Sequence, residues 1–283
     1  MLFSRRRPSA PPGSGSATLR ILDLEVRFGG VHALRQVGLE LAKGEVCAVV
    51  GSNGSGKTTL LNAISGFVRP NGGQIWADDL PLHRLPAHAR RGAGIGRAFQ
   101  VPPILAGWTV GQYLATASYW SGAPAWYRSV ALPAHSARQI RGAREDAAEG
   151  LARIGVEASL DAHLSEISLG ELKLIDVTRA AIGGDRLVML DEPTSGLGLG
   201  EVDRLRAFVR AIGDAGPSVI IVEHNLEFVA DIADHVLVLD DGAVVAAGNP
   251  ADVFAEEAVR RSYMGDFARH GRLAGTSSPE STS

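Results

Sequence analysis

Residues 51–58 read GSNGSGKT, and they stand directly between the apolar run VCAVV at 46–50 and the helically spaced segment KTTLLNAISGF at 57–67. The eight residues match the pattern GxxxxGK[ST] in full. Glycines let backbone N–H groups turn inward around phosphate oxygens, and the following helix adds the positive end of its dipole. Because a strand, a glycine loop and a helix are the context that this motif requires, the stretch predicts a phosphate-binding loop.

The loop also supplies the side chains that a nucleotide and its cation need. Lys57 is placed to reach β and γ phosphate oxygens, and Thr58 can ligate Mg²⁺. We therefore expect the nucleotide to be bound by the loop and the first turn of the helix, namely Gly51, Ser52, Asn53, Gly54, Ser55, Gly56, Lys57, Thr58 and Thr59.

The composition is that of an ordinary globular protein. The 283 residues are 45% hydrophobic and 21% charged, with a formal charge of −3 that gives no general attraction to nucleic acid. No apolar stretch approaches the roughly 18 residues needed to cross a bilayer. Cys47 is the one cysteine, which excludes an internal disulfide framework, and its place inside VCAVV predicts a buried structural thiol.

Strands and helices alternate along most of the chain, which predicts a parallel sheet covered on both faces. β-structure is expected from about residue 19 to about residue 50, before the loop. A largely helical block over 101–165 interrupts the alternation. The ends, residues 1–18 and 269–283, are rich in polar residues, proline and glycine, and are expected to be disordered tails.

A second chemical element is LVMLDEP at 187–193, an apolar run that ends in two carboxylates. Such a run places Asp191 and Glu192 at the carboxyl end of a central strand, where open α/β sheets bind ligands. Asp191 would hold Mg²⁺, directly or through water, and Glu192 would orient or deprotonate an attacking water. Two acids before Pro193 would suit a simple turn equally well if they stood alone, but the phosphate loop favours the functional interpretation.

The third element is ISLGELKLIDVTRAAI at 167–182, where Ser168, Gly170 and Glu171 open a helix. Ser followed three residues later by Glu is by itself a capping box. In its order after the phosphate loop and before LVMLDEP, however, the stretch resembles the signature motif of ABC ATPases, Leu-Ser-Gly-Gly-Gln/Glu. The resemblance implies that this helix start donates hydrogen bonds to the γ-phosphate of ATP bound by a partner chain.

Three further positions match the same family. Gln100, at the end of GIGRAFQ, resembles the glutamine that couples nucleotide to subunit contact, and it is expected to act in catalysis and to ligate Mg²⁺ together with Thr58 and Asp191. His224, after SVIIVE, resembles the switch histidine that contacts the γ-phosphate. Phe28 in EVRFGG resembles the aromatic residue on which adenine stacks, although a core aromatic is the alternative.

The resemblance covers roughly residues 19–268 and implies a specific fold. This is an α/β P-loop NTPase of the ABC ATPase type, with a parallel core sheet, an N-terminal antiparallel β subdomain and an inserted α-helical subdomain at about 101–182 that carries the signature motif. The stretches VRFGGVHAL and EGLARIG and the tail from 242 resemble the ATP-binding subunits of branched-chain amino acid or urea importers.

The family implies an ATP hydrolase with ATP and Mg²⁺ as cofactors, peripheral to the cytoplasmic face of the plasma membrane. Its implied partners are two transmembrane permease subunits, a second ABC ATPase chain in a homodimer or heterodimer and, indirectly, an extracytoplasmic solute-binding protein, with no nucleic acid. Branched-chain amino acids are the first choice of solute. The alternatives are urea or another small amide or amino acid, a lipopolysaccharide-export-type ATPase, a soluble non-transport ABC ATPase, or a nucleotide-binding regulator with little hydrolysis.

Three residues, in two stretches of the chain, depart from the family pattern. Leu169 replaces the first signature glycine, a position that carries larger residues in this subgroup, and function is expected to survive. Gly198 and Leu199 stand where many relatives have Asp or Asn-Pro, in a loop that communicates between the two sites of a dimer. The change is expected to slow one site without abolishing ATP binding.

Overall fold

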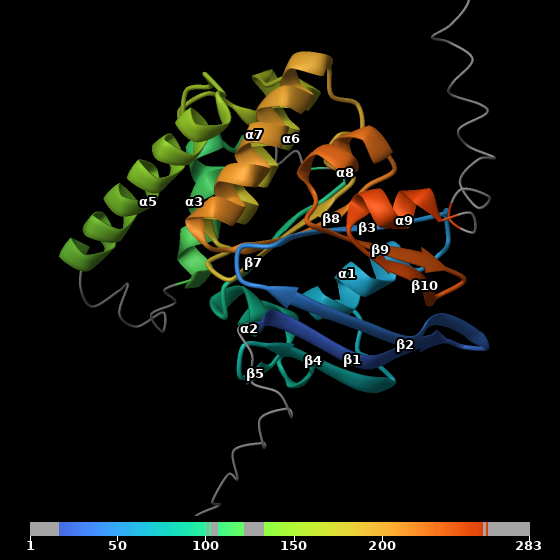
Figure 1. The fold of residues 1–283 in the computed structure, drawn as a ribbon. Coiled ribbons are helices and arrows are strands. Elements are labelled where there is room, and N and C mark those ends of the chain that lie inside the picture. Colours follow the sequence, from blue (N-terminus) through green and yellow to red (C-terminus); the bar gives the residue numbers. More distant parts are fainter. Residues whose placement is uncertain (1–16, 101, 103–106, 122–132, 257–258, 260–283) are drawn as a thin grey trace, which may run out of the picture.

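The computed structural model describes residues 17–100, 102, 107–121, 133–256 and 259. These residues form a six-stranded sheet with helices on both faces, a four-stranded antiparallel sheet beneath it, and a group of helices at one side (Figure 1). The expected tails lie outside the described residues, except that the first strand begins at Ala17, two residues before the expected start of the domain.

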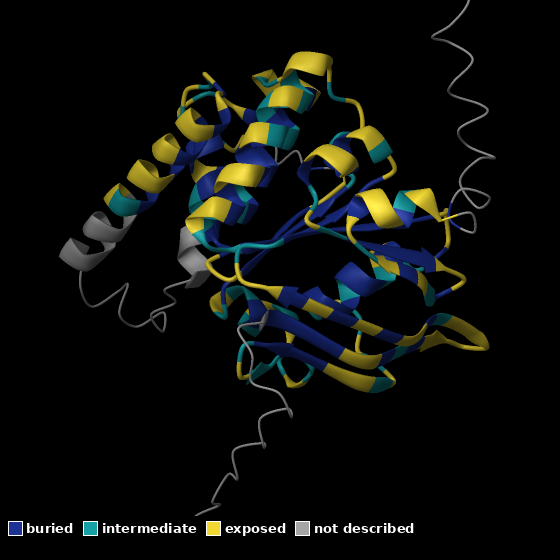
Figure 2. Ribbon diagram, viewed as in Figure 1, coloured by how far each residue is buried: buried dark blue, intermediate teal, exposed yellow. Residues whose placement is uncertain are grey.

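The six-stranded sheet has the order β10-β9-β3-β8-β7-β6, and the five strands from β9 to β6 run parallel to one another. Its central strands β3, β7 and β8 are buried along their whole length, as their continuous apolar sequences predict (Figure 2). The six strands are β3 (Val46–Gly51), β6 (Ile95–Ala98), β7 (Leu187–Asp191), β8 (Ser218–Val222), β9 (His235–Asp240) and β10 (Ala243–Gly248).

The sixth strand makes the sheet mixed rather than purely parallel. β10 pairs antiparallel with β9, because Asp241 (φ 43°) and Gly242 (φ 78°) form a two-residue turn between them. Two consecutive positive φ angles are typical of the type I′ hairpin turn, for which Asp-Gly is a preferred sequence. The parallel core that the sequence predicted is confirmed, with this antiparallel edge added to it.

The four-stranded sheet forms the N-terminal β subdomain and has the order β2-β1-β4-β5. β1 and β2 make a long hairpin through Gly29 and Gly30, and β4 returns antiparallel to β1. The strands are β1 (Ala17–Phe28), β2 (Val31–Ala42), β4 (Gly72–Ala77) and β5 (Leu80–Pro81).

Helix α1 (Lys57–Ser65) lies between the two sheets (Figure 1). Its buried residues Leu60, Leu61 and Ile64 join one hydrophobic core with inward residues of both sheets. Gly66 ends the helix with φ 84°, the left-handed conformation that glycine adopts without steric cost. The helix that follows the phosphate loop is therefore held from both sides, which fixes the position of the loop.

Successive residues of the central strands point to opposite faces of the six-stranded sheet. Val219 and Ile221 of β8 pack toward α6 (Leu169–Ile182), α7 (Leu199–Ala215) and α8 (Leu226–Ile232), whereas Ile220 and Val222 face α1. The short α9 (Pro250–Ala255) covers β9 and β10.

The helical subdomain consists of α3 (Val110–Ser121), α5 (Pro133–Ile154), the 3₁₀ turn Leu164–Glu166 and α6, with each long helix packed against the other two. Two short elements without sequence prediction precede it, the 3₁₀ turn Leu82–Arg84 and α2 (Ala87–Gly92). In the part of the chain that the structure describes, no helix combines the length and apolar character of a membrane span.

Candidate nucleotide-binding site

The phosphate loop connects β3 to α1 and curls around its own lysine. Gly54 (φ 84°) and Gly56 (φ 107°) adopt left-handed conformations. Lys57 Nζ donates to the carbonyl oxygens of Gly51 at 2.7 Å and Ser52 at 2.8 Å. Burial lowers the pKa of Lys57, and the nearby Glu192 and Asp191 carboxylates partly oppose that shift. The amine thus lies at the mouth of the loop, within the field of both carboxylates.

The loop is packed closely against two neighbouring turns. A Cβ atom added at Gly56 would lie 2.6 Å from the carbonyl oxygen of Ala33 in β2, and Gly242 N donates to Ser55 O at 3.0 Å. Ser55 Oγ is buried without a hydrogen-bond partner among the described residues. The loop therefore has the shape of a backbone cradle with polar atoms still to satisfy, which fits a bound phosphate chain.

Gly56→Ala is expected to destabilise the protein by more than about 2 kcal/mol, because it adds a left-handed residue cost of about 1–2 kcal/mol to a clash with backbone. Gly54→Ala is the matched control, since Gly54 is also left-handed but has open space around its Cβ position. Gly54→Ala should lower the free energy of unfolding by about 1 kcal/mol. Urea unfolding of both variants measures the difference, and equal losses would contradict the role of the Ala33 contact.

Three predicted residues meet at the carboxyl ends of adjacent strands. Gln100 follows β6, Glu192 follows β7 and His224 follows β8. Gln100 Nε2 donates to Glu192 Oε2 at 2.5 Å, and His224 Nε2 lies 3.0 Å from Glu192 Oε1. Both carboxylate oxygens of Glu192 are therefore held by residues that the sequence had singled out.

The backbone of Glu192 is unusual, since its φ of 48° is rare outside glycine. Its N–H donates to Val222 O at 2.9 Å, and its carbonyl oxygen accepts from Ser195 N and lies 3.5 Å from Lys173 Nζ of α6. Strain of this kind persists where surrounding contacts hold it, often at functional sites. The side chain is thereby turned toward Gln100 and His224.

Asp191 is paired with an arginine that sequence reasoning missed. Arg97 of β6 donates through Nη2 to Asp191 Oδ2 at 3.1 Å and through Nη1 to Asn62 Oδ1 at 2.7 Å and Ser65 Oγ at 2.8 Å. Burial raises the pKa of Asp191, Arg97 opposes that shift, and Glu192 adds to it. The sequence shows Arg97 as the one charged residue in a short apolar strand, but it does not show which residue Arg97 binds.

Glu223 is a second residue that the sequence did not reveal. It is 3% exposed, and it accepts hydrogen bonds from Thr194 N at 2.8 Å, His224 N at 3.0 Å and Asn225 N at 3.3 Å. The carboxylate thus fixes the loop after β7 against the loop after β8, and so fixes Glu192 and His224 relative to each other.

The predicted metal ligands all offer oxygen. Thr58 contributes a hydroxyl from the first turn of α1, Gln100 retains its amide oxygen because Nε2 faces Glu192, and Asp191 keeps Oδ1 free of Arg97. Among the described residues there is no group of three or more His, Cys, Asp or Glu that could hold a metal ion. A few hard oxygen donors fit Mg²⁺, which is usually held by one or two carboxylates together with substrate phosphates.

The predicted signature residues lie at the N-terminus of α6. Ser168 is the N-cap, accepting from Glu171 N at 3.2 Å, and its hydroxyl donates to Glu171 Oε2 at 2.9 Å. Gly170 lies against the Glu201 carboxylate of α7, which leaves no room for a side chain. Within the described ranges, no hydrogen bond joins this helix start to residues 51–59. Leu169 and Leu199, two of the three residues that depart from the family pattern, are 72% and 89% exposed.

Phe28 lies at the end of β1 and is 52% exposed, so it is not a core aromatic. It pairs with Val31 across the hairpin, two residues before the Ala33 that contacts Gly56. The ring therefore stands on the hairpin that borders the phosphate loop.

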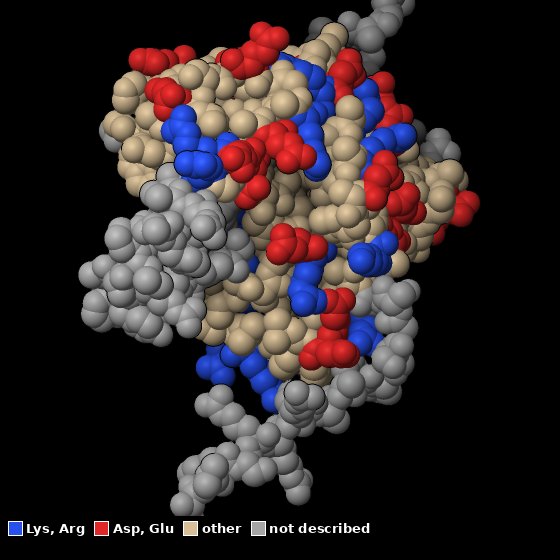
Figure 3. Space-filling view, turned by 90° about the vertical axis from the view of Figure 1, so that its left-hand side faces the viewer, with Lys and Arg blue, Asp and Glu red and all other residues tan. Residues whose placement is uncertain are grey.

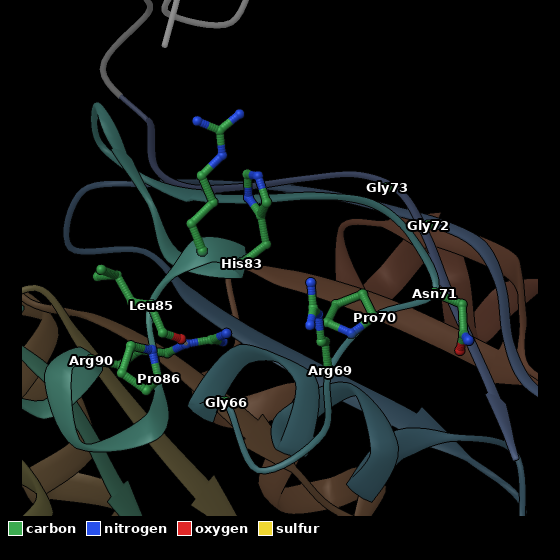
Figure 4. Close-up of a pocket in the computed structure, with 11 residues that line it drawn as sticks. Gly66, Arg69, Pro70, Asn71, Gly72, Gly73, His83, Leu85, Pro86 and Arg90 are labelled. Carbon is green, nitrogen blue, oxygen red and sulfur yellow. Dashed lines mark hydrogen bonds between the residues drawn. The ribbon is translucent and has the colours of Figure 1, made fainter. Parts of the chain in front are cut away.

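A cavity of about 770 Å³ lies at the other end of α1 (Figure 4). Arg69, His83, Arg84 and Arg90 line it, and Arg90 Nη1 also caps α1 by donating to Ile64 O at 2.7 Å. None of the residues predicted to bind nucleotide is among those that line it. This cavity is therefore separate from the residues that carry the predicted chemistry.

Comparison with known proteins identifies relatives of this chain. The model of the ABC transporter family matches residues 34–195. The high-affinity branched-chain amino acid transport ATP-binding protein BraF of Pseudomonas aeruginosa is 29% identical over 249 residues, covering 88% of this chain and 98% of BraF. The probable branched-chain amino acid transport ATP-binding protein LivG of Archaeoglobus fulgidus is 32% identical over 252 residues, covering 87% and 95%.

The fold agrees as well. The crystal structure of a nucleotide-free ATP-binding cassette from an ABC transporter matches with a TM-score of 0.75 and 26% identity, over 87% of this chain and 98% of that one. Motif order, converging side chains, family match and fold all lead to one assignment. The chain belongs to the ABC transporter family, as an ATP-hydrolysing subunit.

Proposed function

We propose that this chain powers uptake of a small solute as the ATPase of an ABC importer, with branched-chain amino acids as the solute class. The Glu192 carboxylate held between Gln100 and His224, beside the phosphate loop, is the observation that carries the hydrolytic part. The solute class is supported by similarity to BraF and LivG along nearly their whole length. Urea or another small amide or amino acid remains the runner-up.

The nucleotide is bound first by the loop. Backbone N–H groups of residues 51–59 surround the phosphates, Lys57 moves from its contacts with loop carbonyls to the β and γ oxygens, and the exposed Phe28 ring stacks on adenine. Thr58, Gln100 and Asp191 would hold Mg²⁺, which supplies neutralisation of phosphate charge.

Hydrolysis uses the residues at the strand ends. Glu192 accepts a hydrogen bond from the attacking water and takes its proton as the water oxygen bonds to the γ-phosphorus and the bond to the ADP oxygen breaks. Gln100 and His224 orient the carboxylate from either side, and His224 also reaches the γ-phosphate.

A second ATPase chain completes the site. Ser168, Gly170 and Glu171 form a helix start without hydrogen bonds to the phosphate loop of the described chain, and a helix N-terminus favours anions. These residues serve the ATP bound by the partner chain, in a homodimer or a heterodimer. ATP binding closes the pair and hydrolysis reopens it, a shift between two conformational states.

Closure is passed to two transmembrane permease subunits, which receive solute from an extracytoplasmic binding protein. The ATPase is thus peripheral to the cytoplasmic face of the membrane. On the face shown in Figure 3, acidic and basic side chains are interspersed, in contrast to the basic field that marks nucleic-acid binders. That pattern supports a protein partner over a nucleic acid.

Affinity purification of tagged Glu192→Gln from native membranes tests the assembly. Because the variant should retain ATP and stay closed, two multi-spanning permeases and an ATPase partner are expected to copurify. Binding of branched-chain amino acids by the cognate extracytoplasmic protein would then support the solute class. Recovery with ribosomes or DNA in the soluble fraction would overturn the transport assignment, and recovery with urea-binding components would replace the solute.

A further inference from the structure

The edge strand β6 is completed by side chains of α6 instead of by another strand. β6 lies at the end of the sheet, next to β7. The carbonyl oxygen of Arg97 accepts from Arg179 Nη2 at 2.7 Å, and Phe99 N donates to Asp176 Oδ2 at 2.8 Å. An acceptor and a donor two residues apart are the groups that a neighbouring parallel strand would bind. The Asp176–Arg179 pair takes the place of that strand.

The pair is itself rigidly held. Asp176 is 1% exposed, and its Oδ1 accepts from Arg179 Nε at 2.7 Å and from the Tyr113 hydroxyl at 2.6 Å. Arg179 lies over the Tyr113 ring, 5.3 Å from its centroid. Burial alone would lower the pKa of Arg179, but Asp176 and Tyr113 together raise it, so the guanidinium stays charged. The Asp176 carboxylate thus joins α3, α6 and the residue that directly follows β6.

The segment that this pair binds ends at the catalytic site. Gln100 follows Phe99 directly and donates to Glu192. Lys173 lies one turn before Asp176 on α6. Its Nζ donates to the carbonyl oxygen of Ser195 and lies 3.5 Å from the carbonyl oxygen of Glu192. Helix α6 therefore contacts the chain before Gln100 and the chain after Glu192, while its own first turn carries Ser168 and Gly170.

We propose that Asp176 and Arg179 are positioning residues for ATP hydrolysis. They fix the segment 97–99 to α6, and thereby set the place of Gln100 against Glu192. The inference rests on the proposed hydrolytic role of Glu192 and extends it into the helical subdomain. Under this proposal, helix α6 serves two sites: it positions Gln100 in the site of its own chain, and its N-terminus faces the nucleotide bound by the partner chain.

Asp176→Asn tests the role. In the wild type, three donors share the two carboxylate oxygens of Asp176. The asparagine amide has a similar volume, but it has only one oxygen that can accept hydrogen bonds. We expect kcat to fall by about 10-fold to 100-fold, the effect of an ångström-scale misplacement. The dissociation constant for ATP should stay within about twofold, since the phosphate loop is untouched. Hydrogen exchange at the Phe99 amide, measured in peptides over 95–100, should rise.

Asp203→Asn is the matched control, since Asp203 forms an ion pair with Arg206 at the same i,i+3 spacing but is exposed on α7. It should change neither kcat nor exchange over 95–100. Arg179→Lys is the second variant, which keeps the charge and loses the fork that joins Asp176 to Arg97 O, and it should reproduce the loss of kcat.

Each outcome is decisive. Faster exchange over 95–100 with unchanged kcat would overturn the proposal, since the segment would move without effect on hydrolysis. Parallel loss of kcat, ATP affinity and melting temperature in both variants would also overturn it, in favour of a purely structural role. A wild-type protein without ATPase activity would instead refute the proposed function, and the exchange measurement would still report whether Asp176 holds Phe99.

Discussion

Glu192→Gln is expected to lower kcat for ATP hydrolysis by about 100-fold or more, while the dissociation constant for ATP changes by less than about threefold. The amide has the shape of the carboxylate and can still contact Gln100 and His224, but it cannot take a proton from water. The phosphate loop and Lys57 are left intact. Single-turnover phosphate release and equilibrium binding of a fluorescent ATP analogue separate the two quantities.

Glu227→Gln is the appropriate control, because Glu227 is an exposed glutamate in the first turn of α8, the helix that follows His224. It should hydrolyse ATP as the wild type does. Normal turnover in Glu192→Gln would contradict the assignment and would direct attention to Glu223, another carboxylate at this edge. Such a result would also remove the nucleotide-binding regulator as a simple alternative, since hydrolysis would persist.

Glu192 was predicted from the apolar run before it, whereas Gln100 and His224 were singled out by resemblance to ABC ATPases. All three residues follow apolar runs, and the carboxyl ends of parallel strands meet at one edge of the sheet. The parallel sheet therefore explains why residues so far apart in the chain lie together. Their hydrogen bonds depend on the strand order, because β6, β7 and β8 are neighbours in space although helices separate them in the chain.

The contacts of Arg97 and Asp176 could not be read in the same way. Each is a charged residue inside an apolar pattern, which shows that a partner must exist without showing which residue it is. Apart from Arg179 on the same helix, the side-chain partners come from α1, β7 and α3 and are separated from Arg97 and Asp176 by 32 or more residues along the chain. Only the packing of α1 and of the helical subdomain against the sheet decides these distant pairings.

The antiparallel direction of β10 was not predicted from the sequence. Asp241 and Gly242 between two apolar runs are a local signal for a two-residue hairpin, so the antiparallel edge was available from the sequence. Helix α2, in contrast, is six residues long and includes Arg90 and Arg91, so it has too few turns to show a periodic pattern. Its residue Arg90 donates to the carbonyl oxygens of Ala63 and Ile64 at the end of α1, a contact that the sequence does not show.

Arg97→Met is expected to lower the free energy of unfolding by about 3–5 kcal/mol, the usual cost of removing one partner from a buried ion pair. Arg97 and Asp191 have side chains only 8% and 7% exposed. Methionine can fill the volume and contact the Phe67 and Phe99 rings, which now lie 5.8 and 5.2 Å from the guanidinium carbon. It leaves the Asp191 carboxylate without its counter-charge. Urea unfolding monitored by circular dichroism gives the change.

The matched control is Arg153→Met, which breaks the exposed ion pair with Glu149 at 2.7 Å on α5 and should cost about 0–0.5 kcal/mol. The double variant Arg97→Met/Asp191→Asn separates pairing from packing, because it leaves no unpaired charge in the core. It should be no less stable than Arg97→Met alone, although hydrolysis is lost with Asp191. If the losses of unfolding free energy from the two substitutions instead added, the ion pair itself would contribute nothing beyond the other contacts of each side chain. The hydrogen bonds from Arg97 to Asn62 and Ser65 would then be the contacts that join α1 to the sheet.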